Sequence, residues 1–522
     1  MADIHASPAT NQPFVRGPFY TNGRFELRFA SMLDLVRIAY GVDPEKVLGG
    51  PSWLEFDRFD VFAMAPAGST NESRKQMLKE LLADRFKLET HTDSKPIAAW
   101  ALKAPKKPLL KEPDGKSAAG CNFTVENNGP QPDPANRPLP VIVYTCHQTT
   151  METFAAGMPD MPAAGQYLNN RLVADQTGIQ GAFDFTIRFT PKVPSGFNVT
   201  GESIPLPDAL EKQLGLKMEQ ASVSMPVVVV DKVNQKPTEN SPEALKSFPP
   251  PPTEFDVAEI RPAKPASPGA NQRAEVKNGR IYIPGITLKN LISIAYNIQG
   301  NADELFIGAP KWLDSERFDL IAKTPAGVAI GDLTPSRAGI SVNIDALQPM
   351  FRSLLIERFK LAAHMEDRPV PTYTLVANKP KLKKAEAGSR TKWSEGAAPD
   401  SKDSKNANPT LGRLVTCQNL TMKQFSELLP SIAPGYLHTI VTDATGLEGG
   451  FDFVFSFSPA GVLQQGGGSG GGDSAVSEAS VPSGALSLFD ALNRQLGLKL
   501  EMVKRPMPAL VIEHVEQKPT DN

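Results

Sequence analysis

Two histidines occupy equivalent places in the sequence and could act as catalytic bases. His91 follows RFKLET, and His364 follows RFKLAA. An imidazole titrates near neutral pH, so it can accept a proton from a nucleophile or a water molecule. No Ser, Cys or carboxylate stands at a spacing typical of a catalytic partner. We therefore favour a structural role, in which each histidine bonds a backbone carbonyl near a connection between a helix and a strand.

A second candidate group is a pair of Arg-x-Asp motifs. Arg58 and Asp60 lie in PSWLEFDRFDV, and Arg317 and Asp319 lie in the related stretch PKWLDSERFDL. A guanidinium and a carboxylate two residues apart lie on the same face of a strand, where they could bind a polar ligand. An ion pair or a turn hydrogen bond would also explain the spacing, and we favour this structural interpretation.

The signatures of common enzymes and metal sites are absent from the sequence. SRTK (389–392) has the Ser-x-x-Lys form of serine acyl enzymes, but it stands among Lys, Gly and Ser and lacks the required KTG strand. HExxH, GxSxG and phosphate-binding loops do not occur. None of the three cysteines lies near a histidine at zinc-binding spacing. We predict neither a metal ion nor a cofactor.

Composition excludes two classes of partner. The 522 residues carry a formal net charge of -2, so no overall positive field attracts nucleic acid. The longest apolar runs, such as PVVVV (226–230), are far shorter than the roughly 20 residues of a membrane-spanning helix. Lys and Pro stretches at 103–116 and 379–388 could meet an anionic partner, but solvated loops are the favoured interpretation.

The cysteines carry information about the compartment. Cys121 and Cys146 flank a Pro-rich and Asn-rich segment and could close a disulfide. Cys417 aligns with Cys146 but has no partner of its own. If the bond forms, the protein folds in an oxidising compartment.

The chain repeats itself over most of its length. Five blocks recur in the same order, namely 49–68 with 308–327, 77–96 with 350–369, 145–154 with 416–425, 175–185 with 443–453, and 208–240 with 490–522. A unit of this size is a duplicated domain rather than a solenoid repeat. We predict a first copy at 1–240, a Pro-rich linker at 241–254 and a second copy at 255–522 with a Gly-rich insertion near 464–474.

The alignment of the two copies also predicts that residues precede Met1. Ala2 falls opposite Ala258, so Met1 stands where the second copy is already within the expected strand FDVAEI. An export signal is expected among the upstream residues. We therefore expect a periplasmic or secreted protein, although a cytoplasmic location is also compatible with the sequence.

Strand and helix patterns alternate within each copy. In the second copy we expect strands at 255–260, 279–286 and 372–379, and helices at 288–296 and 345–359. Thr421 is expected to cap a further helix. The expected fold is α+β, with two homologous domains that each pack a mixed or antiparallel sheet against several helices.

These blocks resemble a paralogous acidobacterial (Solibacter-type) family of exported proteins built on a domain of unknown function. The resemblance is carried by GGPSWLEFDRFDV, LLADRFKL, DQTGIQGAFDF and DALEKQLGLK followed by MPVVVVDKV. It implies export but no activity or catalytic residue. The closing helix and strand, SLFDALNRQLGLKLEMVKRPMPALVIEHV, is similar to the end of the partner-binding modules of secretins and TonB-dependent receptors.

Two functional hypotheses follow. The first is a non-enzymatic extracytoplasmic protein that binds a protein, a peptide or an envelope ligand and has an interaction or sensory role. The second is a hydrolase of unfamiliar type that uses His91 and His364. A deep polar pocket around either histidine would favour the hydrolase, and a shallow face would favour binding.

Overall fold

The structure is a computed structural model. It describes residues 2–8, 15–21, 23–66, 68–113, 115–126, 139–168, 171–192, 202–246, 248, 251–263, 274–298, 303–328, 330–331, 342–386, 390–396, 413–460 and 486–520. Helices and strands are mixed throughout, which confirms the expected α+β class. The Gly-rich insertion at 464–474 lies outside the described residues.

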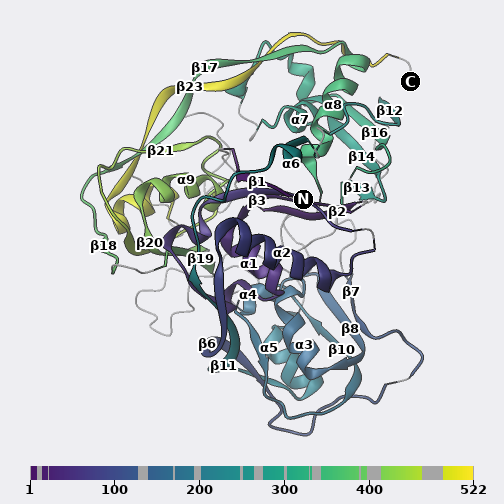
Figure 1. Ribbon diagram of the computed structural model, residues 1–522, viewed down its shortest axis with the longest axis vertical. Helices are drawn as coiled ribbons and strands as arrows, with labels where there is room; N and C mark the ends of the chain where they lie inside the picture. Colours follow the sequence, from purple (N-terminus) through teal and green to yellow (C-terminus); the bar gives the residue numbers. More distant parts are fainter. Residues whose placement is uncertain are drawn as a thin grey trace.

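Four small sheets of the same kind recur along the chain (Figure 1). The first has the order β1-β5-β3-β2, with β1 (Ala2–Ala6), β2 (Arg16–Thr21), β3 (Arg24–Ser31) and β5 (Arg58–Met64). The second has the order β10-β8-β7, with β7 (Gly120–Glu126), β8 (Val141–Thr150) and β10 (Ala182–Phe189). A bridge between Lys111 and Asp184 takes the place of its fourth strand.

The second copy repeats this arrangement. Its first sheet has the order β12-β16-β14-β13, with β12 (Val257–Pro262), β13 (Glu275–Lys277), β14 (Arg280–Thr287) and β16 (Arg317–Lys323). Its second sheet has the order β18-β22-β20-β19, with β18 (Lys383–Lys384), β19 (Lys392–Gly396), β20 (Arg413–Leu420) and β22 (Phe451–Phe457). All four sheets therefore share one strand order.

Two long antiparallel ribbons connect the small sheets, one in each copy (Figure 1). They pair β6 (Glu89–Lys103) with β11 (Lys217–Lys232), and β17 (Ala362–Ala377) with β23 (Leu498–His514). Short parallel strands extend the ribbons at their ends, namely β4 (Val47–Gly49), β9 (Val173–Asp175), β15 (Phe306–Ile307) and β21 (Val441–Asp443). The expected strand at 372–379 is thus the second half of a longer strand.

Helices fill the space between the small sheets and the ribbon ends. The longer ones are α1 (Met32–Tyr40), α2 (Asn71–Phe86), α3 (Met151–Gly157), α7 (Leu288–Ala295), α8 (Ile344–Phe359) and α9 (Met422–Ile432). The short ones are α4 (Gly165–Leu168), α5 (Leu206–Ala209), α6 (Pro242–Lys246) and α11 (Leu488–Ala491), and α5 and α11 continue as π-helical turns at Leu210–Leu214 and Leu492–Leu496. The expected helix at 345–359 is confirmed as α8.

The same capping interaction starts one helix beside each small sheet. Ser31, Thr150, Thr287 and Thr421 each accept a hydrogen bond from the backbone N–H three residues later. Such a cap satisfies an N–H group that has no partner inside the helix. The cap predicted at Thr421 is confirmed, and its three counterparts mark α1, α3 and α7 as equivalent helices.

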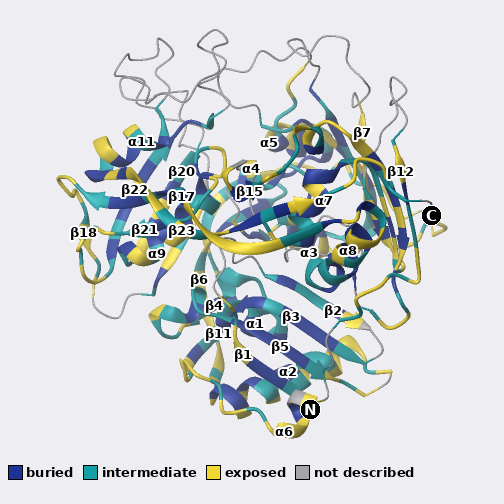
Figure 2. Cartoon of the chain, turned by 90° about the horizontal axis from the view of Figure 1, so that it is seen from above, coloured by how far each residue is buried: buried dark blue, intermediate teal, exposed yellow. Residues whose placement is uncertain are grey.

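We call each small sheet with its two main helices and one ribbon end a module. The first module includes α1 and α2, the second α3 and α5, the third α7 and α8, and the fourth α9 and α11. Each has its own hydrophobic core, which is the dark blue interior in Figure 2. The described residues therefore form four modules in two pairs, a finer division than the duplication seen in the sequence.

The two copies contact each other through partly buried ion pairs. Arg16 Nη1 donates to both carboxylate oxygens of Asp345, at 2.6 and 2.7 Å. Arg390 pairs with Glu55 at 2.7 Å and also donates to the backbone carbonyl of Val47 at 2.6 Å. Burial raises the pKa of Glu55, whereas the Arg390 guanidinium lowers it. These contacts join the first module to both modules of the second copy.

The predicted linker at 241–254 is not extended throughout. Pro242–Lys246 forms α6, which lies against β1 of the first sheet (Figure 1). Asn240 holds the start of this segment, because its side chain bonds the backbone of Ile4 at 2.9 and 3.0 Å. Residues 242–246 of the predicted Pro-rich linker therefore form a helix that folds onto the first copy.

Cys121 and Cys146 are opposite each other on β7 and β8 and are joined by a disulfide of 2.03 Å. In the fourth module Trp393 stands opposite Cys417, so an indole occupies the place of the first cysteine. Burial raises the pKa of the Cys417 thiol to about 12. The two strands are therefore joined at this position by a covalent bond in the first copy and by side-chain packing in the second.

Replacing Cys121 with Ser should lower the free energy of unfolding of the first copy by about 3 kcal/mol, because the bond closes a loop of 25 residues. Urea unfolding of the whole chain would measure this. A reductant should destabilise the unmodified protein by a similar amount and leave the variant unchanged. An equal effect of the reductant on both proteins would contradict the prediction.

Candidate functional site

The first Arg-x-Asp motif holds a bulge in the neighbouring strand. The carboxylate of Asp60, which is 4% exposed, accepts hydrogen bonds from the Phe29 N–H at 2.9 Å and the Ser7 hydroxyl at 2.5 Å. Arg58 Nη1 donates to the Phe29 carbonyl at 3.4 Å and pairs with Asp34 at 3.3 Å. Phe29 has a φ of 52°, a conformation that non-glycine residues rarely adopt. The motif therefore clamps a strained backbone residue.

The second motif does the same in the third module. Asp319 accepts from the Gly285 N–H at 3.0 Å, and Arg317 Nη1 donates to the Gly285 carbonyl at 2.8 Å. The φ of Gly285 is 59°. In both copies the Arg and the Asp bond the same bulge residue, and the contacts in the structure give these four side chains a structural role.

The other two modules contain the clamp without the arginine. Asp184 accepts from the Gln148 N–H and Asp452 from the Asn419 N–H, each at 2.8 Å, and both donors have a positive φ. The sequence signal is a Phe-Asp pair in RFD, AFD, RFD and GFD, at Phe59, Phe183, Phe318 and Phe451 with the following Asp. Only the pairs of the first and third modules also contain Arg, and these two formed the motif expected from the sequence.

The histidines lie on the ribbons and do have carboxylate partners. His91 Nδ1 is 2.9 Å from Asp231 across the ladder, and His364 Nδ1 is 3.2 Å from Glu513. Each histidine is the third residue of its strand, close after α2 or α8, so it lies near a helix-to-strand connection as expected. Its Nδ1 contacts a carboxylate rather than a backbone carbonyl. The signal was present, because Asp231 and Glu513 align in VVVVDKV and ALVIEHV.

We call these two pairs the His–carboxylate pairs. A carboxylate on Nδ1 selects the tautomer and orientation of an imidazole, which suits a general base. The His91 and His364 side chains are 53% and 50% exposed, however. Exposed ion pairs contribute little to stability, so these pairs are also compatible with ordinary cross-strand contacts on a ribbon surface.

An apolar hollow of about 50 Å³ opens between the first sheet and α2. It is lined by Tyr20, Phe25, Ala63, Met64, Ala65, Arg74, Met77, Leu78 and Leu81. Tyr20 and Met64 at its rim are 40% and 43% exposed, and the Arg74 guanidinium lies 4.5 Å from the centre of the Tyr20 ring. Burial raises the pKa of Tyr20, and Arg74 opposes this effect.

Sequence reasoning missed this hollow because its lining comes from the ends of three strands and one helix. No period in the sequence brings Tyr20 next to Met64. The arrangement can take an apolar group, and Arg74 can meet a carboxylate or an aromatic ring beside it.

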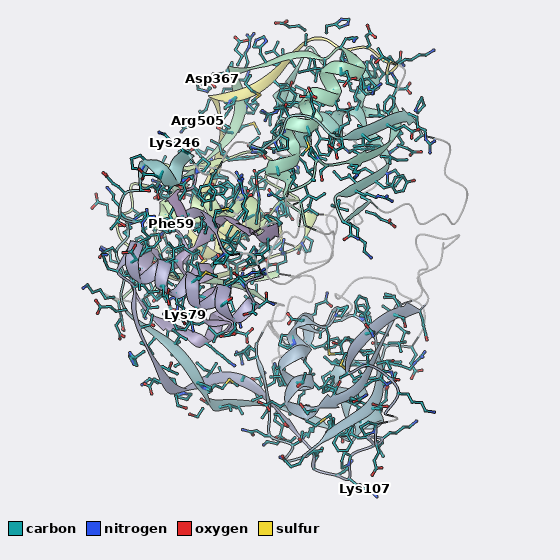
Figure 3. The ribbon with its side chains drawn as sticks, turned by 45° about the vertical axis from the view of Figure 1, so that its right-hand side comes forward. Phe59, Lys79, Lys107, Lys246, Asp367 and Arg505 are labelled. Atoms are coloured by element: carbon teal, nitrogen blue, oxygen red, sulfur yellow. A yellow bond between two sulfur atoms is a disulfide. The ribbon has the colours of Figure 1, made fainter. Side chains whose placement is uncertain are left out.

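The remaining sequence candidates have simpler surroundings. Lys103 pairs with Glu219 at 2.8 Å and Lys106 with Glu211 at 3.4 Å, so part of the first lysine stretch contacts its own chain (Figure 3 labels the neighbouring Lys107). Ser389 of SRTK lies outside the described residues.

In the described ranges no cluster of three potential ligands is placed to hold a metal ion. None of the described helices has the length and hydrophobicity needed to cross a membrane.

Replacing Asp60 with Ala should destabilise the protein by about 1–3 kcal/mol, because two donors lose a buried acceptor. Asp319→Ala should cost less, since Asp319 is partly exposed and accepts one bond from Gly285. Urea unfolding of both variants would measure the difference. Equal losses, or a larger loss for Asp319, would contradict this account of the clamp.

The comparisons with known proteins place the chain in a family. The model of a family described as "Protein of unknown function (DUF3738)" matches residues 33–233 and 289–515. No curated protein and no solved structure matches the chain. The two matched regions cover most of the sequence and correspond to its two copies. The chain therefore belongs to the DUF3738 family and contains its domain twice.

Proposed function

We propose that this protein binds a protein or peptide partner through apolar surfaces of its modules, outside the cytoplasm. The observation that carries the proposal is the hollow beside Tyr20 and Met64. An apolar concave site with a few polar groups at its rim is the usual form of a binding site. A partner would insert an apolar side chain there and direct an acidic or aromatic group towards Arg74.

The disulfide between Cys121 and Cys146 supports an extracytoplasmic location. Disulfides persist in oxidising compartments and are rare in the cytosol. The resemblance of the sequence to exported proteins agrees with this. The likeness of the closing helix and strand to receptor modules further supports an interaction role.

A photo-crosslinking amino acid at Tyr20 should capture a partner in the native envelope, because the Tyr20 side chain stands at the rim of the hollow. Met64→Glu should reduce this crosslink about tenfold, since a buried charge would cost at least about 1.4 kcal/mol of binding free energy. Mass spectrometry of the product would identify the partner.

The same crosslinker at Phe123 provides the matched control. Phe123 is an aromatic residue that is 49% exposed on β7. It should not give the Tyr20 product. Identical products from both positions, or a Tyr20 crosslink that is insensitive to Met64→Glu, would refute binding at the hollow.

A hydrolase remains the second candidate function, because one specific observation favours it. The His–carboxylate pair occurs in both copies, with Asp231 and Glu513 in equivalent positions. A base oriented in this way could activate water for attack on an ester or amide exposed at the ribbon.

If the pairs are catalytic, the double variant with His91→Ala and His364→Ala should lose at least 100-fold of any hydrolysis of a panel of nitrophenyl esters, the usual contribution of a general base. His438→Ala, which alters another exposed histidine, should retain the activity. An unmodified protein without hydrolysis, or a double variant with full activity, would exclude these pairs as catalytic groups.

A further inference from the structure

We propose that the outer face of the β12-β16-β14 sheet is a docking surface for a short helical peptide of another protein. This inference rests on the proposed partner-binding function and deepens it, because it names a second surface and the chemistry of its partner. On the equivalent face of the first copy, a segment of the chain already occupies that place.

In the first copy, α6 and Phe248 cover the outer face of the β1-β5-β3 sheet. Ala244 of α6 is 2% exposed, and the Phe248 ring lies 6.1 Å from the ring of Phe62 on β5. The Arg24 guanidinium lies 5.7 Å from the centres of both rings. Under this cover Phe62 is only 8% exposed. Figure 3 labels Lys246 at the end of α6, near these strands.

The chain reaches α6 by a path that the second copy repeats. Thr238 N–H donates to the Arg85 carbonyl at 2.9 Å, and Thr520 N–H donates to the Arg358 carbonyl at 2.8 Å. Each threonine ends a Gln-Lys-Pro-Thr stretch, and the two stretches are equivalent in the two copies. The outer faces of the two sheets are therefore equivalent in position, and their coverage can be compared residue by residue.

The face is open in the second copy. Ile321 stands where the first copy has Phe62, yet it is 40% exposed. Tyr282 and Val257, on the two flanking strands, are 37% and 64% exposed. Tyr282 and Ile321 are opposite each other in the ladder, so they form an apolar strip across β14 and β16, while Glu259 lies opposite Ile321 on β12. The structure thus presents uncovered apolar side chains where the first copy has covered ones.

One shared residue and one difference define the preferred partner. Arg280 stands in the place of Arg24, within the same Asn-Gly-Arg turn, so it can stack on an incoming aromatic ring as Arg24 does on Phe248. Glu26, which pairs with Arg24 at 3.7 Å, is replaced by Tyr282. At this position the second face therefore presents an aromatic ring in place of a carboxylate.

The occupant that fits is one helical turn with a small residue on its inner side, followed by an aromatic residue. The segment SPEALKSF (241–248) has this form, with Ala244 and Phe248 four residues apart. A partner peptide of this kind would bury its small residue on the sheet and place its aromatic ring between Ile321 and Arg280.

A synthetic peptide of residues 238–248 with an N-terminal fluorophore is a suitable probe. Fluorescence anisotropy with the full chain should show saturable binding. Ile321→Glu should weaken it at least tenfold, and so should replacing the peptide's phenylalanine with alanine. Val454→Glu, which alters another exposed aliphatic residue in the fourth module, should have no effect. Because Ile321 is exposed, its substitution should leave the circular dichroism spectrum unchanged.

The results distinguish this inference from the proposed function. Absence of peptide binding, or equal binding to the Ile321→Glu variant, would overturn the docking surface. Binding that persists in that variant but is lost with Phe62→Ala would place the peptide on the first copy, which also overturns it. The Tyr20 crosslink lies in another module and should survive Ile321→Glu. If the Tyr20 crosslink does not form in the protein without further substitutions, the partner-binding function at the hollow is refuted instead.

Discussion

The exchange of strands in the two ribbons is the constraint on which the rest of the structure depends. In the first copy, Val228 and Val230 of β11 complete the core of the first module, although β11 begins at the second. Leu102 of β6 completes the second module in return. The second copy does the same through β23, whose Leu510 and Ile512 enter the third module. Because each core takes a strand end from its neighbour, the pair of modules is the unit that folds. This explains why the family is matched over about 200 residues at a time rather than over single modules.

The middle of each ribbon has a different role from its ends. Among the described residues, β4 and β9 pair only with the ends of the first ribbon, so its central residues have edges that could pair with another chain. Pro96 and Pro226 stand in the centre of the first ribbon, and Pro369 and Pro506 are opposite each other in the second. Proline has no N–H to offer, and charged side chains such as Asp367 and Arg505 surround these positions (Figure 3). The sequence of the ribbons thus limits edge-to-edge association while the ends remain buried.

The sequence predicted the duplication, the α+β class, α8 and the cap at Thr421, because these depend on local patterns. The four modules were missed because the halves of each copy share little beyond a Phe-Asp pair and a capping Ser or Thr, at different spacings. The clamp of Asp60 requires knowledge of which strand lies beside it, and periodicity does not supply this. The hollow at Tyr20 and the open face at Ile321 were missed for a related reason. Both depend on which segment covers a surface, and α6 lies in a stretch that its prolines mark as a linker.

A duplicated chain also separates residues that maintain the fold from residues free to change. The clamping aspartate is present in all four modules, and so is the helix-capping hydroxyl, because every module needs the same bulge and the same helix start. The outer faces differ: Phe62 corresponds to Ile321, and Glu26 to Tyr282. The residues that recur in both copies have side chains of types suited to catalysis or binding, but their contacts are internal. The chemistry that distinguishes the copies lies on the faces that diverge, where one copy is covered by its own chain and the other presents an apolar strip beside Arg280.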